Sequence, residues 1–194
     1  MEAPGRERDG VLIAQFQAGR ESAFDELVKR HMEKAVQLAR TVCGNYEDAK
    51  DISQEAFVKA YHALKNFKGE AQFSTWFYRI LMNSAKDYLR KKKRLRLADW
   101  DDAQSKDHFL ESVASPEPGP AGSALLSEFE RQVTAAIEKL PFQQQWIFIL
   151  RFLEGFSLKE IAQATGLAEG TVKAALHFGM KKFKAEISAI SGKG

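Results

Sequence analysis

Residues 157–173 read Ser-Leu-Lys-Glu-Ile-Ala-Gln-Ala-Thr-Gly-Leu-Ala-Glu-Gly-Thr-Val-Lys, a stretch with the spacing of a helix-turn-helix. Ser157 can cap a short helix, because Glu160 follows three residues later and completes a capping box. Gly166 suits the left-handed conformation of a tight turn. The next helix is expected to begin near Glu169. Its inward side chains are expected to be Val172, Leu176, Gly179 and Phe183. Its outward side chains are expected to be Lys173, Ala174, His177, Lys181 and Lys184. An apolar back and a cationic front favour DNA binding over an ordinary helical hairpin.

The rest of the chain also has helical spacing of its apolar residues, and strand-like alternation is rare. We expect helices over about 21–43, 48–66 and 74–92, a further one from Ala124, and another starting at Pro141. Residues 97–124 lose this periodicity and contain three prolines at alternate positions, which cannot continue a helix. The predicted fold class is all-α, with two small helical domains at 1–96 and 125–194 joined by a flexible acidic linker at 97–124.

The helical spacing also predicts which side chains face the two cores. In the helix over 48–66, the inward residues are expected to be Ile52, Ala56, Ala60 and Ala63. In the helix that starts at Pro141, they are expected to be Ile147, Leu150, Phe152 and Leu153.

Charge is unevenly distributed along the 194 residues, although the net charge is only +3. Seven basic residues lie between Lys86 and Arg96 against one acid, whereas the linker has six acids against Lys106. Five lysines follow Gly170 against one glutamate. Two basic segments on an acidic tether fit a polyanion held at two places, or simply two solvated helix ends.

Several classes of protein are disfavoured by composition. The apolar runs are far shorter than the roughly 20 residues that span a bilayer, and the first residues lack the apolar core of a secretory signal. The single cysteine, Cys43, excludes an internal disulfide or a cysteine-rich zinc site. We therefore expect a cytoplasmic protein with no metal, no cofactor and no membrane insertion.

The amino-terminal half contains two polar helix faces and a loop. Asp51, Glu55, Val58 and His62 share one side of a helix with Gln54 at its edge, a pattern that solvation alone would explain. The next helix presents Arg79, Asn83, Lys86 and Arg90 outward with Trp76 at the edge, a set able to hold phosphates and read a base. The loop over 66–73 can wrap an unstacked base, and its Phe67 and Phe73 fit either this role or the core.

These stretches together resemble the extracytoplasmic-function (ECF) sigma factors, the small promoter-recognition subunits of bacterial RNA polymerase. The resemblance rests on four strings in order: residues 12–28, residues 48–57, residues 73–90, and Leu140-Pro141 followed by 156–162 and 169–173. It covers nearly the whole chain apart from the linker.

The resemblance implies a role for each face. Asp51, Gln54 and Glu55 would dock on the clamp helices of the largest polymerase subunit, and the second domain would rest on the flap. A flipped base of the minus-ten element would be captured by the loop from Phe67 to Phe73 with Asn83. The residues implied in minus-ten contact are Phe67, Lys68, Phe73, Trp76, Arg79, Asn83, Lys86 and Arg90, and those in minus-thirty-five contact are Thr171, Lys173, His177, Lys181 and Lys182. The implied partners are core polymerase, promoter DNA and an anti-sigma factor.

The chain departs from the family in its last helix, where several arginines are usual. Ala175, Phe178 and Met180 occupy the corresponding positions. Apolar side chains cannot make the bidentate contacts that arginine makes to guanine, so weaker or more shape-dependent recognition is expected there, with Phe178 and Met180 free to contact a protein.

The sequence disfavours two other functions. A dimeric helix-turn-helix regulator would leave the Asp51/Glu55 face and the loop over 67–73 unexplained. An enzyme is disfavoured because no glycine-rich phosphate loop, metal-ligand pair or nucleophile-histidine-carboxylate cluster is found, so no catalytic residue is expected.

Overall fold

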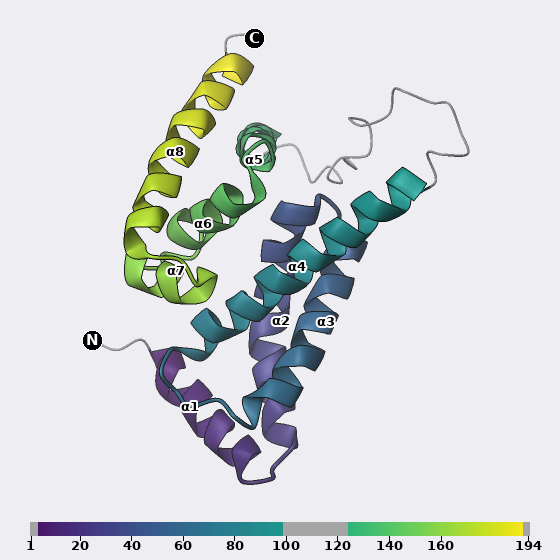
Figure 1. Cartoon of the computed structure of the whole chain (residues 1–194), viewed down its shortest axis with the longest axis vertical. Coiled ribbons are helices and arrows are strands. Elements are labelled where there is room, and N and C mark those ends of the chain that lie inside the picture. Colours follow the sequence, from purple (N-terminus) through teal and green to yellow (C-terminus); the bar gives the residue numbers. More distant parts are fainter. Residues whose placement is uncertain (1–3, 99–123, 192–194) are drawn as a thin grey trace.

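A computed structural model describes residues 4–98 and 124–191, and these residues form helices without strands. The order is α1 (Pro4–Gln17), α2 (Ser22–Cys43), α3 (Tyr46–Leu64), α4 (Phe73–Ala98), α5 (Ala124–Glu138), α6 (Phe142–Phe152), α7 (Leu158–Thr165) and α8 (Glu169–Ser191) (Figure 1). The all-α prediction is confirmed. The predicted linker lies almost entirely outside the described residues.

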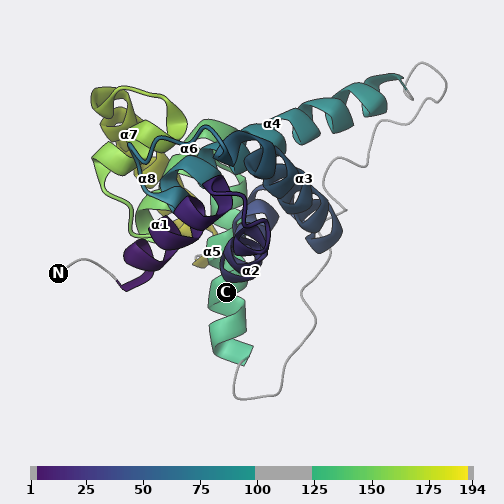
Figure 2. The same cartoon turned by 90° about the horizontal axis from the view of Figure 1, so that it is seen from below.

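The amino-terminal domain consists of α1–α4, with α2, α3 and α4 packed around an apolar core. Leu27, Ile52 and Leu81 are fully buried, and the Phe57 and Phe77 rings stack with centroids 4.3 Å apart. Helix α4 is longer than predicted because residues 93–98, Lys-Arg-Leu-Arg-Leu-Ala, are all good helix formers. Its carboxy-terminal part projects beyond the other helices of the domain (Figure 2).

The carboxy-terminal domain consists of α5–α8 and contains the predicted helix-turn-helix. The capping box of α7 is formed: Ser157 N–H donates to Glu160 Oε2 at 2.9 Å, and Glu160 N–H donates to Ser157 Oγ at 3.2 Å. Gly166 ends α7 with φ +71°, the left-handed conformation that the sequence predicts. Helix α8 buries Val172 fully against this unit.

Three apolar side chains expected in the cores are exposed instead. Ala63 lies on the solvent side of α3. Phe152 and Leu153 are 50% and 55% exposed, although Phe152 still contacts Phe148 with ring centroids 4.5 Å apart. Helix α6 ends at Phe152, so the periodicity that places Ile147 and Leu150 inward stops there.

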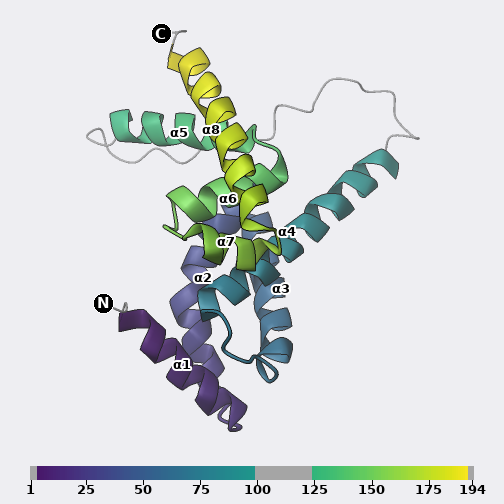
Figure 3. The same cartoon turned by 60° about the vertical axis from the view of Figure 1, so that its left-hand side comes forward.

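The two domains pack against each other, with α7 beside the amino-terminal half of α4 (Figure 3). The Gln145 side-chain amide donates to the Thr41 carbonyl at 2.8 Å, and Lys34 Nζ lies 2.7 Å from Glu154 Oε2. The Tyr78 ring stacks on Phe156 with centroids 5.7 Å apart. Buried residues of both domains therefore form one continuous apolar core. No helix among residues 4–98 and 124–191 is long and apolar enough to cross a bilayer.

Candidate nucleic-acid interface

Helix α3 presents an acidic face to solvent. Its N-terminus is capped by Asn45, whose side-chain oxygen accepts from Asp48 N–H at 2.8 Å. The predicted residues of the face, Asp51, Gln54, Glu55, Val58 and His62, are all exposed. Val58 is 58% exposed in the middle of this polar surface. A single exposed valine is ordinary on a protein surface, so the face is defined by its polar and acidic side chains.

Lys59 moderates the charge of this face. Its ammonium lies 2.6 Å from Glu55 Oε1 and donates to Ser84 Oγ on α4 at 3.0 Å. The bridge therefore holds Glu55 in place relative to α4 while leaving it accessible. Asp51 is exposed one turn after Glu47, an acidic residue of the first turn of α3 that is also exposed.

Helix α4 presents a second exposed face of opposite charge. Arg79, Asn83, Lys86 and Arg90 are all exposed and follow one side of the helix, as predicted. Farther along, Lys92 is held by Asp48, with Nζ 2.5 Å from Oδ2. Burial raises the pKa of Asp48, but hydrogen bonds from Lys92, Tyr88 and Asn45 outweigh it and hold that pKa below its usual value. The ion pair thus ties α4 to the first turn of α3. The exposed row of Arg79, Asn83, Lys86 and Arg90 remains available to phosphates.

The loop between α3 and α4 forms a pocket at the start of this cationic row. The Gln17 side-chain amide donates to the Leu64 and Phe67 carbonyls at 3.0 and 2.9 Å and so fixes the start of the loop. The Phe67 and Trp76 rings are half-buried, and their centroids lie 5.0 Å apart. Phe73 is 4% exposed and stacks on Phe77, so it supports the loop from the core.

The pocket has a volume of about 440 Å³, within the range of ligand-binding pockets. Phe67, Lys68, Trp76 and Arg79 line one side. Asn83, one turn beyond Arg79, is exposed but does not line it. Glu70 also lines the pocket. The aromatic rings suit an unstacked base, and Lys68 and Arg79 are the lining residues that suit its phosphate.

Helix α7 of the other domain forms the opposite wall of the pocket. Ala162, Gln163 and Gly166 contribute this wall, and a Cβ at Gly166 would lie 3.6 Å from the Arg79 guanidinium. In this arrangement α7 occupies space that a nucleotide entering from that side would need.

Helix α8 carries the third polar face. Thr171, Lys173, His177, Lys181 and Lys182 are all exposed. On another side of the helix, Gly179 is buried against α6. It lies so close that a methyl group at this position would be 3.8 Å from Gln144 Cβ. The structure thus holds the cationic front of α8 outward, as the major groove requires.

Family models match both domains. The model described as Sigma-70 region 2 covers residues 27–95, and the model described as Sigma-70, region 4, covers residues 130–183. The chain is 37% identical over 174 residues to the RNA polymerase sigma-H factor of Pseudomonas aeruginosa, covering 87% of this chain and 88% of that one. It is 37% identical over 166 residues to the ECF RNA polymerase sigma-E factor of Escherichia coli K12, covering 85% and 86%.

This chain belongs to the ECF sigma factor family. A solved structure of CnrH in complex with the cytosolic domain of CnrY is similar to this sigma factor, with a TM-score of 0.67, 26% identity, and coverage of 94% of this chain and 98% of that one. The sigma factor RpoE of Bartonella quintana, solved with the anti-sigma factor NepR, shares the fold with a TM-score of 0.68, 24% identity, and coverage of 85% and 96%.

The residues that join the two domains of this sigma factor were missed by sequence reasoning. Glu154 pairs with Lys34, and a side-chain hydrogen bond joins Gln72 to Glu160. Burial, together with the charge of Glu154, raises the pKa of Tyr78 above its usual range. Helical periodicity identifies a buried face but not the distant element that covers it.

Within residues 4–98 and 124–191, no group of three or more His, Cys, Asp or Glu side chains lies close enough together to hold a metal ion.

Proposed function

We propose that this chain binds core RNA polymerase in the cytoplasm and directs it to promoters as a non-catalytic specificity subunit. The acidic face of α3, with Asp51, Gln54 and Glu55, is the proposed contact to the clamp helices of the largest subunit. Carboxylates around exposed Val58 are suited to a cationic partner surface. The carboxy-terminal domain would rest on the polymerase flap.

The observation that carries the promoter part of the proposal is the continuity between the pocket and the cationic row of α4. Arg79 belongs to both: it lines the pocket and begins the exposed row that continues with Lys86 and Arg90. A nontemplate strand whose phosphates follow the row would bring one base to the Phe67 and Trp76 rings. Stacking and phosphate contacts of this kind can offset the few kcal/mol that unstacking a base costs.

The upstream promoter element is the proposed ligand of α8. Its outward lysines and His177 are positioned to hold duplex DNA while α7 supports the helix from behind. Contacts at both ends of the chain would set the spacing between the two promoter elements.

The proposed regulator is an anti-sigma factor. Support comes from the similar CnrH, which was solved in complex with the cytosolic domain of CnrY. A partner that bridges the two packed domains would keep the α4 pocket covered by α7.

The test is reconstitution with purified core polymerase. We expect the full chain to co-elute with core and to direct run-off transcription from specific fragments of a genomic library. The chain alone is expected to turn over no substrate. Failure to join core, or joining it without any promoter-specific transcript, would contradict the proposal.

A further inference from the structure

Two adjacent rows of side chains run along the exposed side of α8. Gly170, Ala174 and Phe178 form one row, called here the apolar row. Lys173, His177 and Lys181 form the other, called the cationic row. Residues four apart on a helix lie one above the other, so each row is a continuous strip.

The position of both rows is fixed by the packing of α8. The helix packs against α5, α6 and α7, and buries Val172 fully. Phe183 contacts Phe148 of α6 with ring centroids 4.9 Å apart. Because this side is held against the domain, the apolar and cationic rows must face any DNA that α8 approaches.

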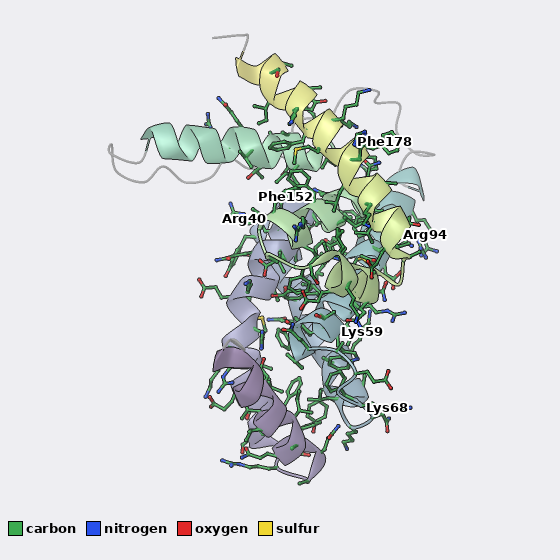
Figure 4. The ribbon with its side chains drawn as sticks, turned by 90° about the vertical axis from the view of Figure 1, so that its left-hand side faces the viewer. Arg40, Lys59, Lys68, Arg94, Phe152 and Phe178 are labelled. Atoms are coloured by element: carbon green, nitrogen blue, oxygen red, sulfur yellow. The ribbon has the colours of Figure 1, made fainter. Side chains whose placement is uncertain are left out.

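Phe178 is 59% exposed, which is unusual for a large aromatic side chain on a cationic surface. Figure 4 labels it on α8 and labels Phe152, another exposed ring, at the end of α6. Besides Ala174, the exposed neighbours of Phe178 on α8 are His177, Lys181 and Lys182, and the His177 ring meets it edge-on with centroids 5.6 Å apart. Cations around an aromatic ring favour nucleic acid over an apolar protein partner.

The chemistry of α8 restricts which base edges it can read. The helix contains no arginine, so it has no planar fork for bidentate contact with guanine. Its lysines are point charges that suit phosphates and can also donate to guanine, but without the planar fork of arginine. The apolar row matches one group of the major groove in particular, the C5-methyl of thymine, which alanine and phenylalanine contact by apolar packing.

We propose that Ala174 and Phe178 read thymine methyl groups in the upstream promoter element. This inference rests on the proposed function and names the base chemistry that α8 selects. Side-chain size increases along the apolar row from Gly170 to Ala174 to Phe178. A recognition helix inserts its amino-terminal turns deepest, so small residues there allow close approach, and the longer Phe178 reaches bases farther from the helix.

The experiment uses holoenzyme, formed from the full chain and core polymerase, and a pool of promoter duplexes randomised in the upstream half. Duplexes that the holoenzyme enriches are resynthesised with single thymines replaced by uracil, which removes only the methyl group. We expect replacement at the contacted positions to weaken binding about fourfold each, the effect of withdrawing one buried methyl-sized group.

Variants of Phe178 assign the effect to this residue. Phe178→Ala should abolish the thymine preference over uracil at one position, whereas Val11→Ala, an equally exposed apolar residue on α1, should leave it unchanged. Phe178→Arg should shift the preferred base at that position toward guanine. Both side chains are exposed, so these variants are expected to fold.

The outcomes separate this inference from the proposed function. If the holoenzyme enriches specific duplexes but binds their uracil forms equally well, the thymine reading is wrong and the proposed function stands. If Phe178→Ala weakens binding to core and keeps the thymine preference, Phe178 is a protein contact and the inference is also overturned. If no sequence is enriched, both proposals fail together.

Discussion

The carboxylate of Glu154, which lies between α6 and α7, pairs with Lys34 of α2, with Nζ 2.7 Å from Oε2. Tyr78 of α4 is 2% exposed, and burial together with the charge of Glu154 raises the pKa of its hydroxyl. One carboxylate therefore connects the carboxy-terminal domain to two helices of the amino-terminal domain. In the same arrangement, Ala162 and Gln163 of α7 line the pocket of Phe67 and Trp76.

Glu154→Ala is expected to loosen the two domains. It removes the partner of Lys34 across the domain boundary and the charged group that acts on the buried Tyr78 hydroxyl. Small-angle scattering should report a larger radius of gyration than for the unchanged chain. Lys139→Met, which breaks an exposed ion pair within the carboxy-terminal domain, is the control. Identical scattering from Glu154→Ala and the control would show that Glu154 does not hold the domains together.

Asp48 predicts part of the acid sensitivity of the amino-terminal domain. Its pKa is lower in the folded chain than in the unfolded chain, so its contribution to stability is present above its unfolded pKa, near 4, and is lost as the pH falls through the folded value. Asp48→Asn should lower the unfolding free energy at pH 7 and flatten its dependence on pH below about 4. Denaturant titrations at several pH values measure this, with exposed Asp25→Asn as the control. If the unfolding free energy of Asp48→Asn falls below about pH 4 as steeply as that of the unchanged chain, the Asp48–Lys92 contact would be rejected.

The buried hydroxyl of Thr75 predicts that a substitution at this position will stabilise the fold. Its hydroxyl is buried and has no hydrogen-bond partner among the described residues. Thr75→Val should therefore raise the unfolding free energy by about 1 kcal/mol. Ser53→Ala is the matched comparison, because Ser53 Oγ donates to the Ala49 carbonyl at 2.7 Å and its loss should be destabilising. Destabilisation by Thr75→Val would mean that the hydroxyl has a partner after all.

The acidic face of α3 predicts a charge-reversal phenotype. Asp51→Arg combined with Glu55→Arg should weaken binding to core polymerase at least 100-fold, because like charges would then meet across the proposed interface. Both side chains are exposed, so the fold should be retained. Asp25→Arg with Glu33→Arg, on exposed positions of α2, makes the same charge change elsewhere. Equal affinity of the two double variants for core would exclude the α3 contact.

Local features of this fold were predictable from sequence because nearby residues determine them. The capping box of Ser157 and Glu160 and the turn at Gly166 depend on residues within one helical turn. The exposed faces of α3 and α4 follow from helical periodicity in the same way. Phe152 and Leu153 were misplaced because periodicity does not say where a helix stops.

Long-range features were not predictable in this way. The pairing of Lys34 with Glu154 joins two domains, and neither residue's neighbours in sequence point to the other. The pocket likewise takes one wall from each domain, so only its Phe67 and Trp76 side could be proposed beforehand. Phe73 illustrates the remaining ambiguity: an aromatic residue beside a loop fits both core and ligand until its burial is known.

The most direct test of the central claim places 2-aminopurine in the nontemplate strand of the minus-ten element and records its fluorescence as holoenzyme binds. Unstacking of one base into the pocket predicts a fluorescence increase at one position. Asn83→Ala and Arg79→Ala should reduce the increase while leaving the affinity for core unchanged, because both side chains lie on α4 and outside the acidic face of α3. A holoenzyme that binds and transcribes without any such increase, or variants that open the strand normally, would contradict the account.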